Sequence, residues 1–159
     1  MTTRISTYLN FRDTAKDAMD FYQSVFGGEL ERNTFAEYQV SEDPAEQDKI
    51  MHSQLTTPGG QVFMAADTPN NMEYREPAGH AVSISGDDEQ ELRGYWEALS
   101  SGGHEIVPLE LSPWGDSFGM CTDRFGVTWM VNIGSPAPQD AGPVSSSVPV
   151  DTSGDATGT

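Results

Sequence analysis

The sequence is short of cysteine and of long apolar runs. Cys121 is the only cysteine among 159 residues, so neither an intrachain disulfide nor a cysteine metal cluster can form. Its surroundings, FGMCTD, indicate a strand, where a buried and unreactive thiol is expected. No stretch approaches the roughly 18 apolar residues that span a bilayer, and the opening MTTRISTYLNF lacks the apolar segment of a signal peptide. We therefore expect a cytoplasmic protein that does not contact membranes.

Basic residues are scarce as well. Eight lysines and arginines stand against 25 aspartates and glutamates, which gives a formal charge of −17. Lys16 and Lys49 are the only lysines, and no basic stretch offers a surface for nucleic acid. Such an acidic protein with so little lysine is typical of a halophile, because dense counterions screen the self-repulsion. The alternative is an ordinary acidic cytosolic protein.

An internal repeat is the most informative feature that is present. Residues 5–28 and 80–103 share one plan, in which an apolar strand is followed by an acidic turn, an amphipathic helix and a double glycine. Thr14 followed by Asp17 resembles a capping box at the start of the first helix. Asp88 and Glu91 are expected to open the second. The aromatic residues of both helices are expected in the core.

Each half continues with three more strand-like runs, so that each is a β-α-β-β-β module. The expected strands are 5–11, 29–37, 49–57 and 61–66 in the first half, and 80–85, 104–109, 117–122 and 127–133 in the second. The polar segment 39–48 is expected to be a surface loop rather than a lid. The sequence thus predicts one α+β domain over 1–134, made of modules at about 4–67 and 80–134.

The composition changes from Ser135 onward. Residues 135–159 are rich in Pro, Gly, Ser and Thr, and they contain no aromatic or basic residue. Such a segment buries too little apolar surface to offset its ordering entropy, which predicts a disordered tail. The tail carries three aspartates, so the acidity belongs mainly to the domain.

Five segments together resemble a known superfamily: YLNF at 8–11, DFYQSVFGGE at 20–29, MHSQL at 51–55, PWGDSFGM at 113–120 and DRFGVTWMVN at 123–132. The chain is similar over about residues 4–134 to the vicinal oxygen chelate superfamily of glyoxalase I, extradiol dioxygenases and bleomycin- and fosfomycin-resistance proteins. Within it, the chain resembles the PhnB-like group, often labelled 3-demethylubiquinone methyltransferase-like. The resemblance implies two βαβββ modules that form a curved mixed sheet around a cleft. It also implies a homodimer, since relatives often pair modules across two chains.

The same resemblance bears on cofactors. No glycine-rich loop follows a first strand of an alternating βα pattern, as nucleotide-type cofactor folds require, so the methyltransferase label gains no support. Superfamily members usually hold a divalent metal with four His, Gln or Glu side chains from the first and last strands of each module. The matching positions here are Met64, Met130, His80 and Thr7, or Ile5 in place of Thr7. Thioethers bind such ions poorly, so no metal site of the usual kind is expected. His80 is the only matching ligand, which leaves an atypical divalent ion open.

His52 is the candidate catalytic residue. Alternation in KIMHSQLTT places Ile50, His52 and Gln54 on one face of a strand, where His52 and Gln54 would meet one ligand if that face lines the cleft. His52 is then either a general base that works near neutral pH or a hydrogen-bonded structural histidine. His80 either contacts substrate or caps its strand, and His104 is expected at the surface.

Further substrate-binding candidates complete the expected cleft. Met64 and Met130 are expected to face it and Trp129 to lie in the core, because methionines suit a planar or hydrophobic ligand. In relatives, the segment PWGDSFG approaches the cleft mouth. That segment and the strand ends add Trp114, Asp116 and Phe118 as binding candidates and Asp67 and Asn132 as rim groups.

Three functions remain open at this level. The first is an enzyme that acts on a small molecule without the usual metal, with His52 as acid or base. The second is a binding module that sequesters a small hydrophobic compound without chemistry, as bleomycin-resistance relatives do. The third is an interaction protein that binds a partner through its acidic tail. The sequence favours the first two over the third.

Overall fold

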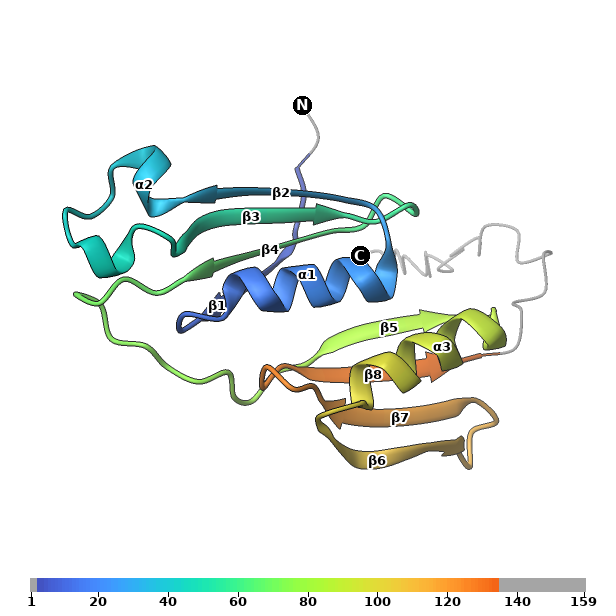
Figure 1. Ribbon diagram of the computed structural model, residues 1–159. Coiled ribbons are helices and arrows are strands. Elements are labelled where there is room, and N and C mark those ends of the chain that lie inside the picture. The colour runs from blue at the N-terminus through green and yellow to red at the C-terminus, as the bar shows by residue number, and fades with distance from the viewer. Residues whose placement is uncertain (1–2, 135–159) are drawn as a thin grey trace, which may run out of the picture.

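The computed structural model describes residues 3–134, so the predicted tail lies outside the described residues. Two modules of one design follow each other along the chain (Figure 1). Module one contains β1 (Thr7–Phe11), α1 (Ala15–Phe26), β2 (Glu29–Thr34), β3 (Ile50–Thr56) and β4 (Val62–Asp67). Module two contains β5 (Val82–Gly86), α3 (Glu89–Ser100), β6 (His104–Leu111), β7 (Ser117–Thr122) and β8 (Thr128–Ile133).

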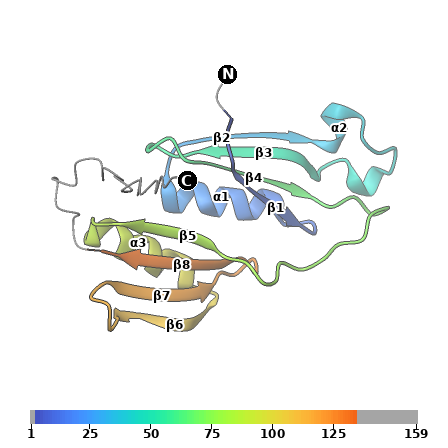
Figure 2. The ribbon, with the colours of Figure 1, turned by 180° about the vertical axis from the view of Figure 1, so that it is seen from behind.

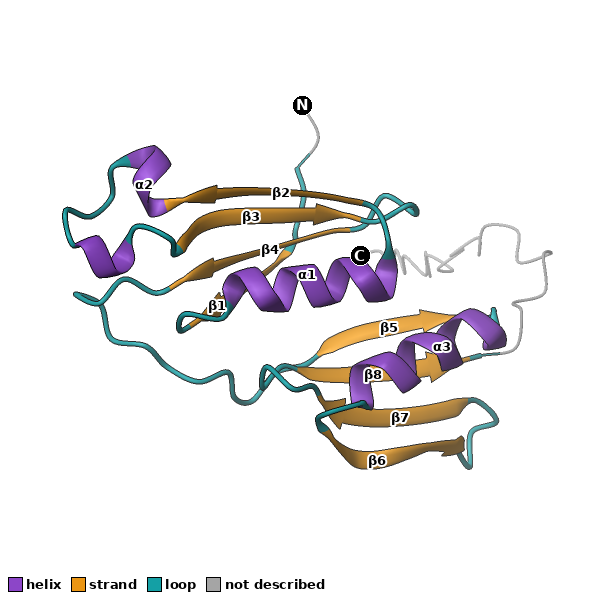
Figure 3. Cartoon of the chain, viewed as in Figure 1, coloured by secondary structure: helices purple, strands orange, loops and turns teal. Residues whose placement is uncertain are grey.

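Each module forms its own four-stranded mixed sheet (Figure 3). The strand order is β1-β4-β3-β2 in one sheet and β5-β8-β7-β6 in the other. In both, the first strand runs parallel to the last, and the other pairs are antiparallel. The predicted α+β fold of two βαβββ modules is therefore confirmed.

The repeated double glycine has the same structural reason in both modules. A Cβ on Gly28 would lie 2.1 Å from the carbonyl oxygen of Thr56, and one on Gly103 would lie 1.9 Å from that of Thr122. No side chain fits at such distances, so only glycine lets the chain pass from the helix into the next strand beside the end of its neighbour.

The two long helices begin in different ways. Asp88 caps α3 as predicted, since its side chain accepts from the backbone N–H of Glu91. The predicted capping box of α1 is wrong, because the side chain of Thr14 makes no capping hydrogen bond. Instead the Asp67 carboxylate, at the end of β4, accepts from the N–H of Ala15 at 3.0 Å. A tertiary contact has thus taken over the role of a local one.

The connection from β2 to β3 is more ordered than a plain polar loop. The strand ends at Thr34, three residues before its predicted end, because Thr34 caps the short helix α2 (Phe35–Tyr38). The one-turn η1 (Pro44–Glu46) follows. Buried Glu46 accepts from Ser41 and from the N–H of Asn70, and it lies 3.6 Å from Lys49 Nζ. These bonds join the connection to Asn70, just after β4.

One hydrophobic core, here called the shared core, joins the modules. It contains the apolar stripes of α1 and α3 and one face of each sheet. Phe63 of β4 and Trp129 of β8 meet there with ring centroids 6.4 Å apart, and Tyr22 of α1 lies 5.4 Å from Trp129. The buried Asp123 carboxylate accepts from the Tyr22 hydroxyl at 2.6 Å and from the Trp129 indole N–H at 2.8 Å. Burial and this carboxylate raise the pKa of Tyr22.

The remaining connection runs from β4 to β5 along one end of the molecule (Figure 2). Across residues 3–134, the longest helices contain 12 residues, and none is long and apolar enough to cross a membrane.

Candidate functional site

Each sheet has a second face, here called its open face, which lies opposite the shared core. Phe63 and Trp129 lie in the shared core, and Trp129 is 1% exposed, as the sequence predicts. Met64 follows Phe63 and Met130 follows Trp129, so each methionine side chain projects from the face of its sheet opposite the shared core. Because the core faces of the two sheets meet, the two methionines point away from each other. A single chain therefore offers two open faces that lie apart.

The open face of module one carries a polar pair beside Met64. Met64 lies between Tyr8 on β1 and Gln54 on β3 in the sheet register. The Tyr8 hydroxyl lies 3.3 Å from Nδ1 of His52, and the two rings are 5.9 Å apart. Partial burial raises the pKa of Tyr8. The predicted companions His52, Gln54 and Met64 thus share one face, and Tyr8 joins them.

Ile50 departs from the predicted pattern. The pairing of β2 with β3 shifts register beside Thr34, where Asn33 pairs with His52 and Thr34 with Ile50. This β-bulge turns Ile50 into the shared core, away from the face of His52, and Ile50 is 1% exposed. Simple alternation fails here because the irregularity inserts one extra residue.

The open face of module two carries two methionines and a phenylalanine among polar residues. Met130 pairs with Ser83 on β5 and with Met120 on β7, and Phe118 lies opposite Asn132. The ring of Trp114 stands 6.0 Å from that of Phe118. The sequence-predicted residues Met130 and Phe118 therefore share this face, with Trp114 beside them.

The loop that carries Trp114 is fixed by hydrogen bonds. Asn132 donates to the Asp116 carboxylate at 2.9 Å, and the Ser112 hydroxyl and N–H both bond to the Asp116 carbonyl. Asp116 thus holds the loop on the sheet, and Trp114 stays 65% exposed. An exposed indole on a fixed loop is a suitable contact for a planar or apolar ligand.

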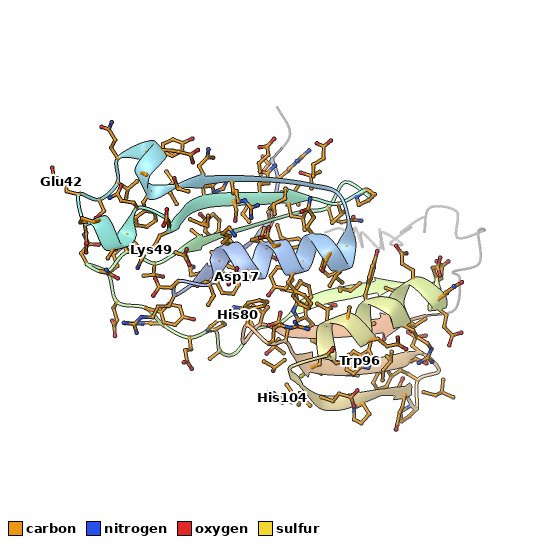
Figure 4. The ribbon with its side chains drawn as sticks, viewed as in Figure 1. Asp17, Glu42, Lys49, His80, Trp96 and His104 are labelled. Carbon is orange, nitrogen blue, oxygen red and sulfur yellow. The ribbon has the colours of Figure 1, made fainter. Side chains whose placement is uncertain are left out.

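His80 does not open a strand. β5 begins at Val82, and His80 lies exposed on the preceding connection with Nδ1 3.0 Å from the Ala78 carbonyl oxygen (Figure 4). The residue beside Met130 on the first strand is Ser83. The chain bends at Gly79, whose φ is +75°, and joins the sheet only at Val82. His104 begins β6 and is exposed, as predicted.

The side chains next to the two methionines do not fit the superfamily's metal. On the first strand of each module these are Tyr8 and Ser83, and a phenol, a hydroxyl and two thioethers make a poor donor set for hard or borderline divalent ions. Within residues 3–134, no three His, Cys, Asp or Glu side chains gather as a metal site would require.

Sequence reasoning missed or misplaced two carboxylates and one phenol. Asp67, expected at the rim, is 5% exposed and accepts from Ala15 and Ile50 backbone N–H groups. Asp123 opens the segment 123–132 and was given no role of its own, yet it joins the modules. Tyr8 belongs to YLNF, and its alternation with Leu9 was the available indication that it faces the other way from the core.

Cys121 agrees with its predicted role. It is fully buried, and burial raises the pKa of its thiol to about 11. A thiol with so high a pKa carries almost no thiolate at neutral pH, so it is unreactive.

The fold and the paired modules are those of the vicinal oxygen chelate superfamily. A glyoxylase/bleomycin resistance protein/dioxygenase domain from Frankia sp. EAN1pec has the same fold. It superposes with a TM-score of 0.59 over 87% of this chain and 96% of that one, at 16% identity.

The chain belongs to the PhnB-like family whose model is described as 3-demethylubiquinone-9 3-methyltransferase and matches residues 3–132. Protein PA1353 from Pseudomonas aeruginosa is 36% identical, with a TM-score of 0.73 over 85% of this chain and 100% of that one. The PhnB protein from Bacillus cereus is 25% identical, with a TM-score of 0.64 over 83% and 100%.

Proposed function

We propose that the protein binds a small, largely apolar molecule, and that a second copy of the chain completes the binding cleft. The observation that carries this proposal is the opposite orientation of Met64 and Met130 with respect to the shared core. Each open face is half of a cleft, and in a homodimer the open face of module one can oppose that of module two from the partner. Tyr8 at 44% and Trp114 at 65% exposure are large aromatic surfaces that such pairing would cover.

The composition of the two faces supports an apolar ligand. Met64, Met120, Met130 and Phe118 are partly buried, so together they offer an adaptable apolar lining. The lining needs no metal to bind such a molecule. Binding without chemistry would make the protein a sequestering module.

A second candidate function is an enzyme that needs no metal. The contact between Tyr8 and His52 favours it, because an imidazole next to a phenol can take part in proton transfer near neutral pH. Here His52 is the catalytic residue, and Gln54 on the same strand orients the ligand.

Nile red fluorescence with two charged variants tests the shared cleft. We expect Met64→Glu and Met130→Glu each to weaken dye binding at least about tenfold, because a carboxylate is buried against an apolar ligand. Met72→Glu, on the exposed connection, is the matched control and should leave binding unchanged.

Mixing the two variants separates a two-chain cleft from a one-chain cleft. A heterodimer of Met64→Glu with Met130→Glu contains one cleft without either substitution, so mixing should restore part of the dye binding. A cleft within one chain cannot be restored in this way. Light scattering that shows a monomer at every salt concentration would contradict the homodimer.

A further inference from the structure

We infer that Tyr8 holds His52 in the tautomer that directs a ring N–H toward the ligand, and that the ligand is therefore an apolar molecule with a carbonyl oxygen. This inference rests on the proposed function, since it names the chemical class of molecule bound at the open face of module one. Tyr8 is a positioning residue in this scheme, and His52 makes the contact.

The sheet geometry brings the two side chains together across a strand. Tyr8 lies on β1 and His52 on β3, with β4 between them. On the same face of β4, Met64 is followed two residues later by Ala66, whose single methyl group leaves room for the phenol to cross. The hydroxyl oxygen reaches Nδ1 of His52 at 3.3 Å, and the ring planes are inclined by 34°.

The direction of this hydrogen bond determines the tautomer. A phenol is a good donor, and an unprotonated imidazole nitrogen is a good acceptor, so the favoured bond runs from the Tyr8 hydroxyl to Nδ1 of His52. A neutral imidazole carries only one ring proton, which must then lie on Nε2. His52 thus offers a donor, and the general-base role would require the opposite tautomer.

A fixed N–H beside Met64 selects for an oxygen acceptor. The surroundings of His52 on this face include Met64 and the amide of Gln54. A site that is built to bond an oxygen rejects an isostere without that oxygen, because its own N–H is then left unpaired. Ketones and aldehydes with an apolar body fit this requirement, whereas plain hydrocarbons do not.

The tautomer is measurable without any ligand. Long-range proton–nitrogen NMR of the histidine rings should show an unprotonated Nδ1 and a protonated Nε2 for His52 at neutral pH. Tyr8→Phe removes the donor and should produce a mixture of both tautomers. Tyr38→Phe, on the exposed helix α2, is the matched control and should preserve the wild-type pattern. An unprotonated Nε2 in the wild-type protein would overturn the inference.

A pair of isosteric probes tests the ligand class. Acetophenone and α-methylstyrene have nearly the same shape, and only the first carries a carbonyl oxygen. We expect the wild-type protein to bind acetophenone about three- to tenfold more tightly, which corresponds to one hydrogen bond. Tyr8→Phe should reduce this ratio, and His52→Leu should remove it.

The outcomes distinguish the inference from the function on which it rests. Equal affinity for both probes in the wild-type protein would leave the apolar site intact and refute the carbonyl preference. Failure of both probes to bind would refute the proposed binding function and the inference together. A ratio that Tyr8→Phe leaves unchanged would refute the positioning role of Tyr8.

Discussion

The two modules share a backbone plan and differ at the positions that face outward. Gly28 and Gly103 meet the same steric requirement, and both sheets have the same strand order. The open faces differ. Module one has Tyr8 and His52 there, whereas module two has Phe118, Met120 and Met130. The two modules therefore share what the chain needs in order to fold and differ at the surfaces available for binding.

The modules also differ in how they are held. Module two begins its helix with a local cap at Asp88, whereas module one depends on Asp67 from a distant strand. The bond between the modules is formed by Asp123, which module two supplies to Tyr22 of module one. Three substitutions and two changes of conditions test these differences, from the largest expected effect to the smallest.

Asp123→Ala should have the largest effect. It leaves the Tyr22 hydroxyl and the Trp129 indole N–H without an acceptor in the shared core, and two turn N–H groups also lose their partner. We expect the free energy of unfolding to fall by about 3–5 kcal/mol, measured by urea denaturation. Asp87→Ala, an exposed carboxylate in the same module, is the control. A loss below about 1 kcal/mol would show that Asp123 does not hold the modules together.

Asp67→Ala and Asp88→Ala compare the two kinds of helix cap. Asp67 is buried and serves two N–H groups, so its loss should cost about 2–3 kcal/mol. Asp88 is exposed and serves one, so about 1 kcal/mol is expected. Hydrogen exchange of the first amides of α1 and α3 locates each effect. Equal losses in the two variants would contradict the distinction.

Acid should weaken module one at its β2–β3 connection. The Ser41 hydroxyl, the Asn70 N–H and then Lys49 lower the pKa of Glu46 below its ordinary value of about 4.3. A lowered folded-state pKa gives stability that is present above that value and is lost as the pH falls through the folded pKa. The wild-type protein should therefore lose more stability than Glu46→Gln between about pH 5 and pH 3. Parallel thermal melts of the two proteins would refute this prediction.

Salt should act on both modules alike, which makes it the least discriminating test. Module one has eleven acidic and five basic residues over 4–67, and module two has nine and two over 80–134. Counterions screen the repulsion within each, so the unfolding midpoint should rise from low to molar KCl by about 5 °C or more. A flat midpoint would refute the halophile interpretation.

Much of the fold could be predicted because its determinants are local. Helical spacing, turn residues and the double glycines predicted both βαβββ modules, and Asp88 was recognised from its place before α3. Prediction failed where tertiary contacts or strand pairing override the local pattern. Asp67 replaces the expected cap of α1, a bulge turns Ile50 inward, and β5 begins after His80.

The candidate site was predictable residue by residue but not as an assembly. Alternation correctly grouped His52 with Gln54 and placed Trp129 in the core. It could not show that Tyr8 crosses β4 to reach His52, because that contact depends on strand order and on the small Ala66 between them.

The sequence by itself determined the two modules, their acidity and the thioether side chains at Met64 and Met130, since these depend on residue type and on spacing along the chain. The tertiary structure alone decided that the modules join through Phe63, Tyr22 and Trp129, so that the two methionines face apart. The physical reason is that burying these large aromatic surfaces favours one docking of the modules, and no pattern within either module records which faces will meet.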